Sequence, residues 1–239
     1  MKRRQSALRG LQREAFRSLW IQTSGHVAAG PFQGLKYLGD RNGTYPQKLL
    51  GTYEKELWPI VEEIVTRSYE RIIDIGAAEG YYVCGLASQI SSATVIAFEA
   101  QQTCHPRIQQ LAGLNGVQNR VDCRGLCLAD DLQDVLSGNQ RTLIVCDIEG
   151  AEFELLDPEA IPKLRGVDLL VEVHDQLRPG TGDELIRRFQ STHEVQVIAT
   201  VPRTIDDLPA GISLSGDLAE AAMEESRGGQ MVWHWMRKR

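Results

Sequence analysis

The chain has 239 residues, which suits one α/β domain with an extension better than two full domains. Hydrophobic residues make up 42% of it and charged residues 24%, as in an ordinary globular protein with a sizeable core. The net charge of -6 argues against a nucleic-acid partner, because phosphate contacts need clustered Lys and Arg. No apolar run approaches the roughly 20 residues that span a bilayer, and no signal core follows the basic start.

The five cysteines are odd in number, and Cys84 and Cys146 lie in apolar runs. A disulfide framework is therefore not expected, which favours a soluble protein in the reducing cytoplasm. Cys123 and Cys127 have the spacing of half a metal site, but the sequence has no second pair to complete it.

Residues 2–21 have the pattern of an amphipathic helix, with Leu8, Leu11, Ala15 and Leu19 on one stripe and Arg9, Arg13 and Arg17 on another. We expect this helix to dock on the core or on a partner subunit, which would make a homo-oligomer. A membrane-surface or transit segment is the alternative. Residues 22–46 are rich in turn formers. Residues 1–46 are therefore an expected extension, acting as a lid or acceptor-site element, before a domain over residues 47–239.

A helical pattern over residues 48–69 is followed by alternating β-branched runs and helix-like stretches. Strands are expected at residues 71–75, 93–98, 120–124, 142–146, 167–171, 193–200 and 231–236. Helices are expected at residues 81–90, 105–115, 130–136, 182–191 and from 151. Such alternation predicts a doubly wound α/β fold with a mainly parallel seven-stranded sheet. Residues 201–229 have only a short helix-like stretch, so the last strand is expected to return antiparallel.

A small-residue loop joins the first strand to the next helix, at the edge of the sheet where open α/β folds bind ligands. It contains Asp74, Gly76, Ala77, Ala78, Gly80 and Tyr81. Small residues let a ligand approach the backbone. A dinucleotide loop would have a third glycine where Tyr81 stands, so the sequence disfavours a nicotinamide oxidoreductase.

Glu99 ends the second strand and is followed by Ala100. A carboxylate at this place can accept hydrogen bonds from both ribose hydroxyls of a nucleoside cofactor. Beyond the third strand, Leu126 and Cys127 are the candidate lining for an adenine ring. The loop and Glu99 together predict a nucleoside-type cofactor.

Acidic residues crowd the ends of the fourth and fifth strands, with Asp147, Glu149 and Glu152 in one group and Glu172, His174 and Asp175 in the other. In a parallel sheet both groups face one crevice. His174 or a carboxylate (Asp147, Glu149 or Glu172) would take a proton from an acceptor. Alternatively, Asp147, His174 and Asp175 would hold a divalent metal ion. The structural alternative is helix capping by the glutamates.

Four stretches together resemble the FkbM-like branch of class I methyltransferases that use S-adenosylmethionine: residues 73–82, Phe98-Glu99, residues 147–152 and residues 172–174. The resemblance implies a Rossmann-like methyltransferase fold with an antiparallel last strand, and O-methylation of sugars or other small molecules. It also implies that Tyr53 and Glu54 close over the cofactor. The acceptor is not implied, because residues 31–43 and 201–229 depart from the family.

Two other functions remain open from the sequence. The first is a protein or peptide methyltransferase that acts on nitrogen or a carboxylate, since an acidic crevice attracts basic peptides. The second is a non-catalytic interaction module that keeps only the fold. The retention of Gly76, Gly80 and Glu99 argues against this last function.

Overall fold

The protein is described by a computed structural model that covers residues 2–39, 45–225 and 231–239. The chain forms two compact units. The first contains Met1–Trp58 and Val201–Gly228, and the second contains Pro59–Thr200 and Gly229–Arg239. The sequence placed the end of the N-terminal extension at residue 46. In the structure the first unit continues to residue 58 and includes the excursion after residue 200.

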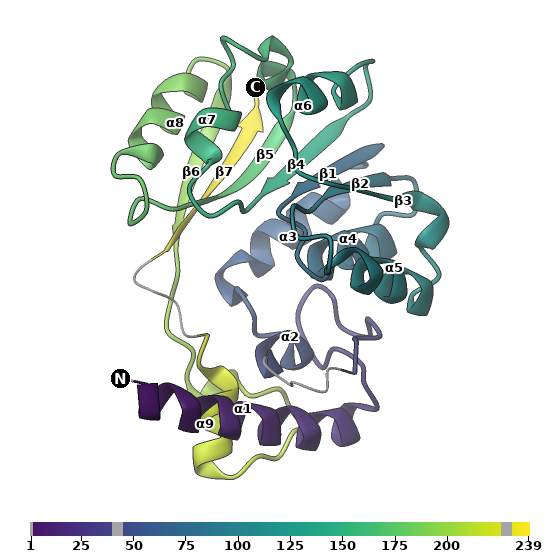
Figure 1. Ribbon diagram of the computed structural model, residues 1–239, viewed down its shortest axis with the longest axis vertical. Helices are drawn as coiled ribbons and strands as arrows, with labels where there is room; N and C mark the ends of the chain where they lie inside the picture. The colour runs from purple at the N-terminus through teal and green to yellow at the C-terminus, as the bar shows by residue number, and fades with distance from the viewer. Residues whose placement is uncertain (1, 40–44, 226–230) are drawn as a thin grey trace. The chain divides into compact units, whose positions relative to one another are not determined.

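The first unit is helical, with α1 (Lys2–Thr23), α2 (Pro46–Leu50) and α9 (Gly216–Met223), and the short 3-10 turns η1 (Lys55–Leu57) and η4 (Ile205–Asp207). The predicted amphipathic helix is confirmed as α1: Ala15 and Leu19 are buried, whereas Arg9, Arg13 and Arg17 are exposed. α1 packs against α9 (Figure 1). The apolar stripe therefore docks within its own unit, as the simpler of the two alternatives expects.

Polar contacts connect the two segments of the first unit. The Gln12 side-chain amide donates to the Glu224 carbonyl at 2.9 Å, and Gln22 exchanges two hydrogen bonds with the Ser213 backbone. The Arg203 guanidinium is 3% exposed, donates to the Thr52 carbonyl at 2.8 Å and pairs with two carboxylates, those of Glu56 and Glu225.

The single helix predicted around residues 48–69 is wrong, because the chain turns after α2. Gly51 has φ +83°, and a Cβ atom there would lie 1.9 Å from the Ala29 carbonyl oxygen. Only glycine fits this position, so α2 ends and the helix resumes as α3 (Trp58–Thr66).

The second unit contains a seven-stranded sheet in the order β3-β2-β1-β4-β5-β7-β6 (Figure 1). All seven predicted strands form, as β1 (Arg71–Ile75), β2 (Thr94–Phe98), β3 (Val121–Arg124), β4 (Thr142–Cys146), β5 (Asp168–Val173), β6 (His193–Ala199) and β7 (Val232–Lys238). The first five are parallel in register, and β7 pairs antiparallel with both β5 and β6. The predicted doubly wound fold with an antiparallel last strand is confirmed.

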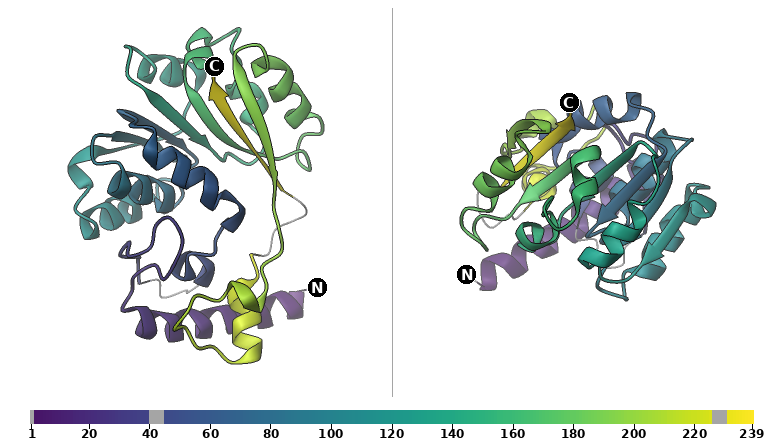
Figure 2. Two further views of the ribbon diagram at one scale, coloured as in Figure 1. Left: turned by 180° about the vertical axis from the view of Figure 1, so that it is seen from behind. Right: turned by 90° about the horizontal axis from the view of Figure 1, so that it is seen from above.

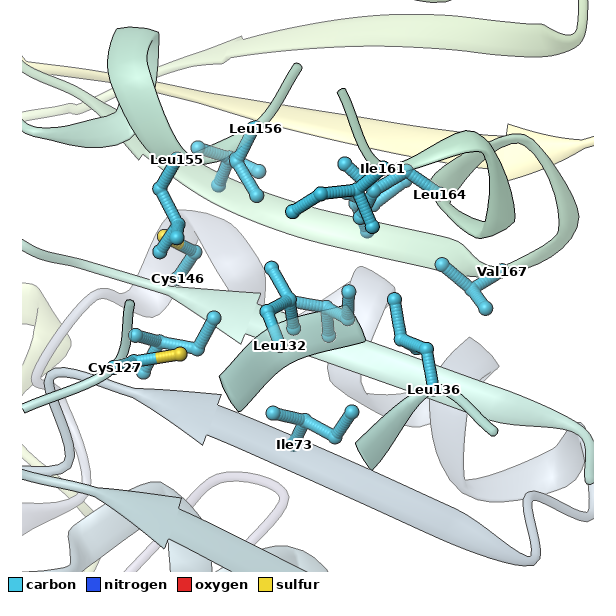
Figure 3. Packing of buried hydrophobic residues seen from close by; sticks show 14 of the residues in the cluster. Ile73, Cys127, Leu132, Leu136, Cys146, Leu155, Leu156, Ile161, Leu164 and Val167 are labelled. Atoms are coloured by element: carbon cyan, nitrogen blue, oxygen red, sulfur yellow. The ribbon is translucent and has the colours of Figure 1, made fainter. Parts of the chain in front are cut away.

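Helices cover both faces of this sheet (Figure 2). On one face lie α6 (Ala129–Val135), α7 (Glu152–Leu155), η3 (Pro162–Gly166) and α8 (Thr181–Phe189). Their apolar side chains form one buried cluster with those of β1, β4 and β5, as Figure 3 shows around Leu132 and Ile73. The other face packs against α3, α4 (Tyr81–Gln89) and α5 (His105–Leu114), with η2 (Gln118–Arg120) leading into β3. Two-sided burial explains why the strands read as continuous apolar runs.

Among the described residues, none of the helices combines the length and the apolar character that a membrane crossing needs.

Candidate active site

The loop between β1 and α4 is fixed to the end of β2. The backbone N–H groups of Gly76 and Ala77 both donate to the Phe98 carbonyl, at 2.9 and 3.1 Å. Within the loop, the Gly80 N–H donates to the Ala77 carbonyl at 2.8 Å, and Gly80 then caps α4 with φ +94°. The loop is therefore a fixed turn that presents backbone at the carboxyl edge of the sheet.

Gly76 contacts the end of β4. It has φ +91°, and a Cβ atom there would lie 1.8 Å from the Asp147 carbonyl oxygen. The Asp147 N–H in turn donates to the Ile75 carbonyl at 2.9 Å. Sequence reasoning assigned the small residue to close approach of a ligand. Backbone packing between β1 and β4 already requires a glycine at this position.

Glu99 fastens the same loop from the β2 side. Its Oε2 accepts from the Ala78 N–H at 2.8 Å and its Oε1 from the Gln101 N–H at 2.7 Å, and the residue is 7% exposed. Ala78 has φ +47°, an uncommon conformation for a residue with a side chain. The predicted meeting of the loop, Glu99 and Asp147 is thus present in the structure.

The other predicted cofactor residues of this unit differ in exposure. Asp74 and Tyr81, at the end of β1 and the start of α4, are buried, whereas Ala100 is exposed after β2. After β3, Leu126 is 63% exposed, but Cys127 is 8% exposed and belongs to the apolar cluster of Figure 3. The Leu126 side chain is therefore accessible to a ligand, whereas the Cys127 side chain is part of the core.

Tyr53 and Glu54 lie in the first unit. Glu54 is buried with φ +49°, and its N–H donates to Glu225 Oε1 at 3.2 Å. The Lys48 amine stands 4.7 Å from the centre of the Tyr53 ring. Their closure over a cofactor stays a prediction.

His174, just beyond β5, lies among the acidic residues that follow β4. Its Nε2 is 3.6 Å from Asp147 Oδ1, 3.5 Å from Glu149 Oε2 and 3.7 Å from Glu172 Oε2. His174 is 1% exposed. The four predicted catalytic residues are therefore brought together. Asp175 is directed elsewhere and accepts a hydrogen bond from the Gly182 N–H at 3.1 Å.

Glu152 holds the other side of the imidazole, a role that sequence reasoning missed. It is fully buried, and its Oε1 is 2.8 Å from His174 Nδ1 and 3.2 Å from both the Ile148 and Gly150 N–H groups. Because a carboxylate oxygen that accepts two N–H groups is unprotonated, His174 Nδ1 must carry the hydrogen. The third acidic position in Asp147-Ile-Glu-Gly-Ala-Glu152 is the available signal, and in the sequence alone it is equally compatible with a helix cap.

The two partners shift each other's pKa in opposite directions. Burial alone would lower the pKa of His174, but the hydrogen bond and charge of Glu152, with the charges of Asp147 and Glu149, raise it above its ordinary value. Burial would likewise raise the pKa of Glu152, but its hydrogen bonds with His174 and the backbone hold it below its usual range.

Glu149 has a strained backbone. Its φ is +55°, and its side chain is 80% exposed. A residue with a side chain in this region costs free energy that a glycine would not. Glu149 therefore places a carboxylate at a backbone position that a glycine would occupy with less strain.

The sequence matches no protein-family model and no curated protein. Solved structures do resemble the fold. A putative O-methyltransferase from Klebsiella pneumoniae is 13% identical with a TM-score of 0.49, over 79% of this chain and 80% of that one. For the O-methyltransferase TomG from Streptomyces achromogenes, in complex with SAM, the identity is 15%, the TM-score 0.47 and the coverage 74% and 77%. At these values the names do not transfer to this chain.

Proposed function

We propose that the protein transfers a methyl group from S-adenosylmethionine to an oxygen atom of a small-molecule or sugar-like acceptor. The observation that supports this most is the convergence of three strand ends: Gly76 after β1 touches Asp147 after β4, and Glu99 after β2 binds the Ala78 N–H. One edge of the sheet thus offers a backbone turn, a buried carboxylate and an acidic group with an imidazole.

The residues present fit the cofactor. Each oxygen of Glu99 accepts one hydrogen bond from the chain, so each keeps acceptor capacity for one of two neighbouring ribose hydroxyls. The backbone turn from Gly76 to Gly80 adjoins the methionine part, and the exposed Leu126 provides an apolar contact for the adenine ring.

When bound, S-adenosylmethionine would supply an electrophilic methyl group on its sulfonium for the acceptor oxygen to take. The chain has to hold the acceptor in line and receive its proton. Asp147, Glu149, Glu172 and His174 are the proposed acceptors of that proton, and Glu152 positions His174 by its hydrogen bond to Nδ1.

The test is calorimetric binding of S-adenosylmethionine to the purified full-length chain. In Glu99→Gln one of the two carboxylate oxygens becomes an amide nitrogen, which cannot accept a hydrogen bond. The side chain therefore loses one charge-assisted hydrogen bond, either to a backbone N–H or to a ribose hydroxyl. The affinity should fall about tenfold to a hundredfold. The control is Asp122→Asn on β3, an exposed carboxylate paired with Arg124, for which the affinity should not change. Absence of binding to the unmodified chain, or equal affinity in Glu99→Gln, would overturn the proposal.

The finer assignments are part of this proposal. They are membership of the FkbM-like branch, a cytoplasmic location and no nucleic-acid partner; the homo-oligomer expected through α1 is not retained, because the apolar stripe of that helix packs against α9. Their support is the sequence motifs, the acidic net charge and the uneven cysteine count.

A further inference from the structure

The residues around His174 have the spacing of ligands that share one ion. Asp147, Glu149 and His174 each offer one ligand atom, and these atoms lie within 4.8 Å of one another. The two separations from Nε2 are 3.5 and 3.6 Å. Two donors that each lie about 2.1–2.2 Å from a metal ion are about 3.0 Å apart at the octahedral angle and about 3.6 Å apart at the tetrahedral angle. Hydrogen-bonded partners would be closer, at about 2.7–3.2 Å.

The buried imidazole provides a second, independent observation. The His174 side chain is 2% exposed, and its Nδ1–H is held by Glu152 at 2.8 Å. Nε2 faces three carboxylates, at 3.5 Å from Glu149, 3.6 Å from Asp147 and 3.7 Å from Glu172, which is longer than an ordinary hydrogen bond. Proteins orient metal-binding histidines in this way, with one nitrogen fixed by a carboxylate and the other directed at the ion.

We propose that Asp147, Glu149 and His174 bind one divalent transition-metal ion. The ligands are a carboxylate oxygen from each acidic residue and Nε2 of the histidine. The imidazole nitrogen favours first-row transition-metal ions over Mg²⁺ or Ca²⁺, whose sites consist of oxygen ligands, and among those ions the two carboxylates suit Mn²⁺. Sequence reasoning named Asp175 as the third ligand, and the geometry replaces it with Glu149.

The position of this site gives the ion a role that rests on the proposed function. Asp147 contacts Gly76 of the loop, so an acceptor hydroxyl held by the ion would lie beside the methyl donor. A cation also favours the deprotonated form of such a hydroxyl. His174 is then a ligand, because the one lone pair of Nε2 cannot serve both purposes, and of the four proposed proton acceptors Glu172 is the one that is not a ligand and receives the proton.

The experiment is a calorimetric titration of MnCl2 into the full-length chain after treatment with a chelator, without S-adenosylmethionine. We expect one Mn²⁺ per chain and weaker binding of Mg²⁺. Asp147→Asn and Glu149→Gln should each weaken Mn²⁺ binding at least about tenfold. The matched control is Glu154→Gln, which removes the same charge from a carboxylate that pairs with Arg178, and it should bind within about twofold of the unmodified chain.

Two results would overturn the metal site: no Mn²⁺ binding at millimolar concentration, or equal affinity in Glu149→Gln. Glu149 is exposed, so its variant is expected to fold even where Asp147→Asn does not. The proposed function fails separately. A chain that binds S-adenosylmethionine but not Mn²⁺ loses only the metal site, whereas one that binds Mn²⁺ but not S-adenosylmethionine loses the methyl donor.

Discussion

At the scale of single residues, the hydrogen bond between Glu152 and His174 determines the state of the imidazole. Its Nδ1 hydrogen is fixed by a carboxylate that two backbone N–H groups keep ionised. The raised pKa of His174 depends on this charge. The folded-state value lies above the unfolded value of about 6.5, so the pair stabilises the fold below that pH and its contribution is lost as the pH rises through the folded pKa.

Replacing this carboxylate by an amide should lower the pKa of the histidine. In Glu152→Gln the shape is kept but the charge is removed, so burial of the imidazole is no longer offset. An NMR titration of the His174 ring protons in the presence of a chelator measures the change. Glu154→Gln is the comparison variant, and a His174 pKa that is the same in both variants would contradict this account.

Gly76 occupies a position that leaves no room for a side chain. In Gly76→Ala the new methyl group would collide with the Asp147 carbonyl oxygen, and φ +91° would be strained. The free energy of unfolding should fall by at least about 3 kcal/mol, measured by urea denaturation. Gly113 in α5 has open space around it, so Gly113→Ala should instead gain about 0.5–1 kcal/mol from helix propensity. Similar values for the two variants would show that the turn can relax.

At the scale of elements, the excursion between β6 and β7 is joined to the N-terminal segment through Arg203. Its guanidinium is 3% exposed and is paired with Glu56 and Glu225 while it donates to the Thr52 carbonyl. Burial, the largest influence, raises the pKa of Glu56 even with this partner beside it. Glu56 therefore depends on the charge of Arg203.

Removing that cation should destabilise the first unit strongly. Arg203→Ala removes the charge that offsets the buried Glu56 carboxylate, at a cost of about 3–5 kcal/mol. Hydrogen exchange of the amides in α1 and α9 reports on this unit directly. Arg13→Ala, on the exposed side of α1, is the control and should leave exchange unchanged. In the double variant Arg203→Ala with Glu56→Gln, partial recovery of amide protection against exchange would identify the buried charge of Glu56 as the cause.

The elements also show what sequence patterns can predict. The central strands β1, β4 and β5 are recognisable because two-sided burial gives each a run of apolar residues, as in Leu143–Cys146, whereas the edge strands β3 and β6 are only partly buried. The helix break at Gly51 is not predictable from the local sequence, because the residue that excludes a side chain there is Ala29, which is distant in the chain. The sequence also does not reveal that α1 and the excursion after residue 200 belong to one unit, because the contacts of α1 with Ser213 and Glu224 join residues that are far apart in the chain.

The candidate site was predictable to the extent that parallel strands share an edge. Asp147 and His174 follow neighbouring strands, so their meeting required only the sheet. The direction of each side chain did not follow from that argument. Asp175 turns to α8 and Glu149 turns toward His174 because of loop conformation, which includes the positive φ of Glu149.

At the scale of the whole molecule, buried histidines make stability depend on pH. Burial lowers the pKa of His193 below its ordinary value, against the hydrogen bond to the Val167 carbonyl at 2.8 Å. Burial lowers the pKa of His234 as well. The unfolded chain takes up these protons near pH 6.5 and the folded chain only at lower pH, so stability is lost as the pH falls from about 6.5 through the folded pKa.

Urea denaturation at pH 7.5 and pH 5.0 measures this dependence. His193→Gln should lose less stability between the two values than the unmodified chain, because glutamine takes up no proton in this range. At pH 7.5 and pH 5.0 the free energy of unfolding of His193→Gln is compared with that of the unmodified chain, and the gap between the two is smaller or reversed at pH 5.0. An identical loss in both proteins would mean that the pKa of His193 is the same in the folded and unfolded states.

The place of β7 in the sheet has a consequence for biosynthesis. β7 lies between β5 and β6, yet it is made after both of them and after the excursion that follows β6. While the ribosome is still adding residues 201–231, the nascent chain holds β5 with an open edge and β6 with no neighbour in the sheet. Open strand edges recruit other chains. The edge of β5 therefore stays open until β7 is made and Trp233 and Trp235 become buried in the sheet.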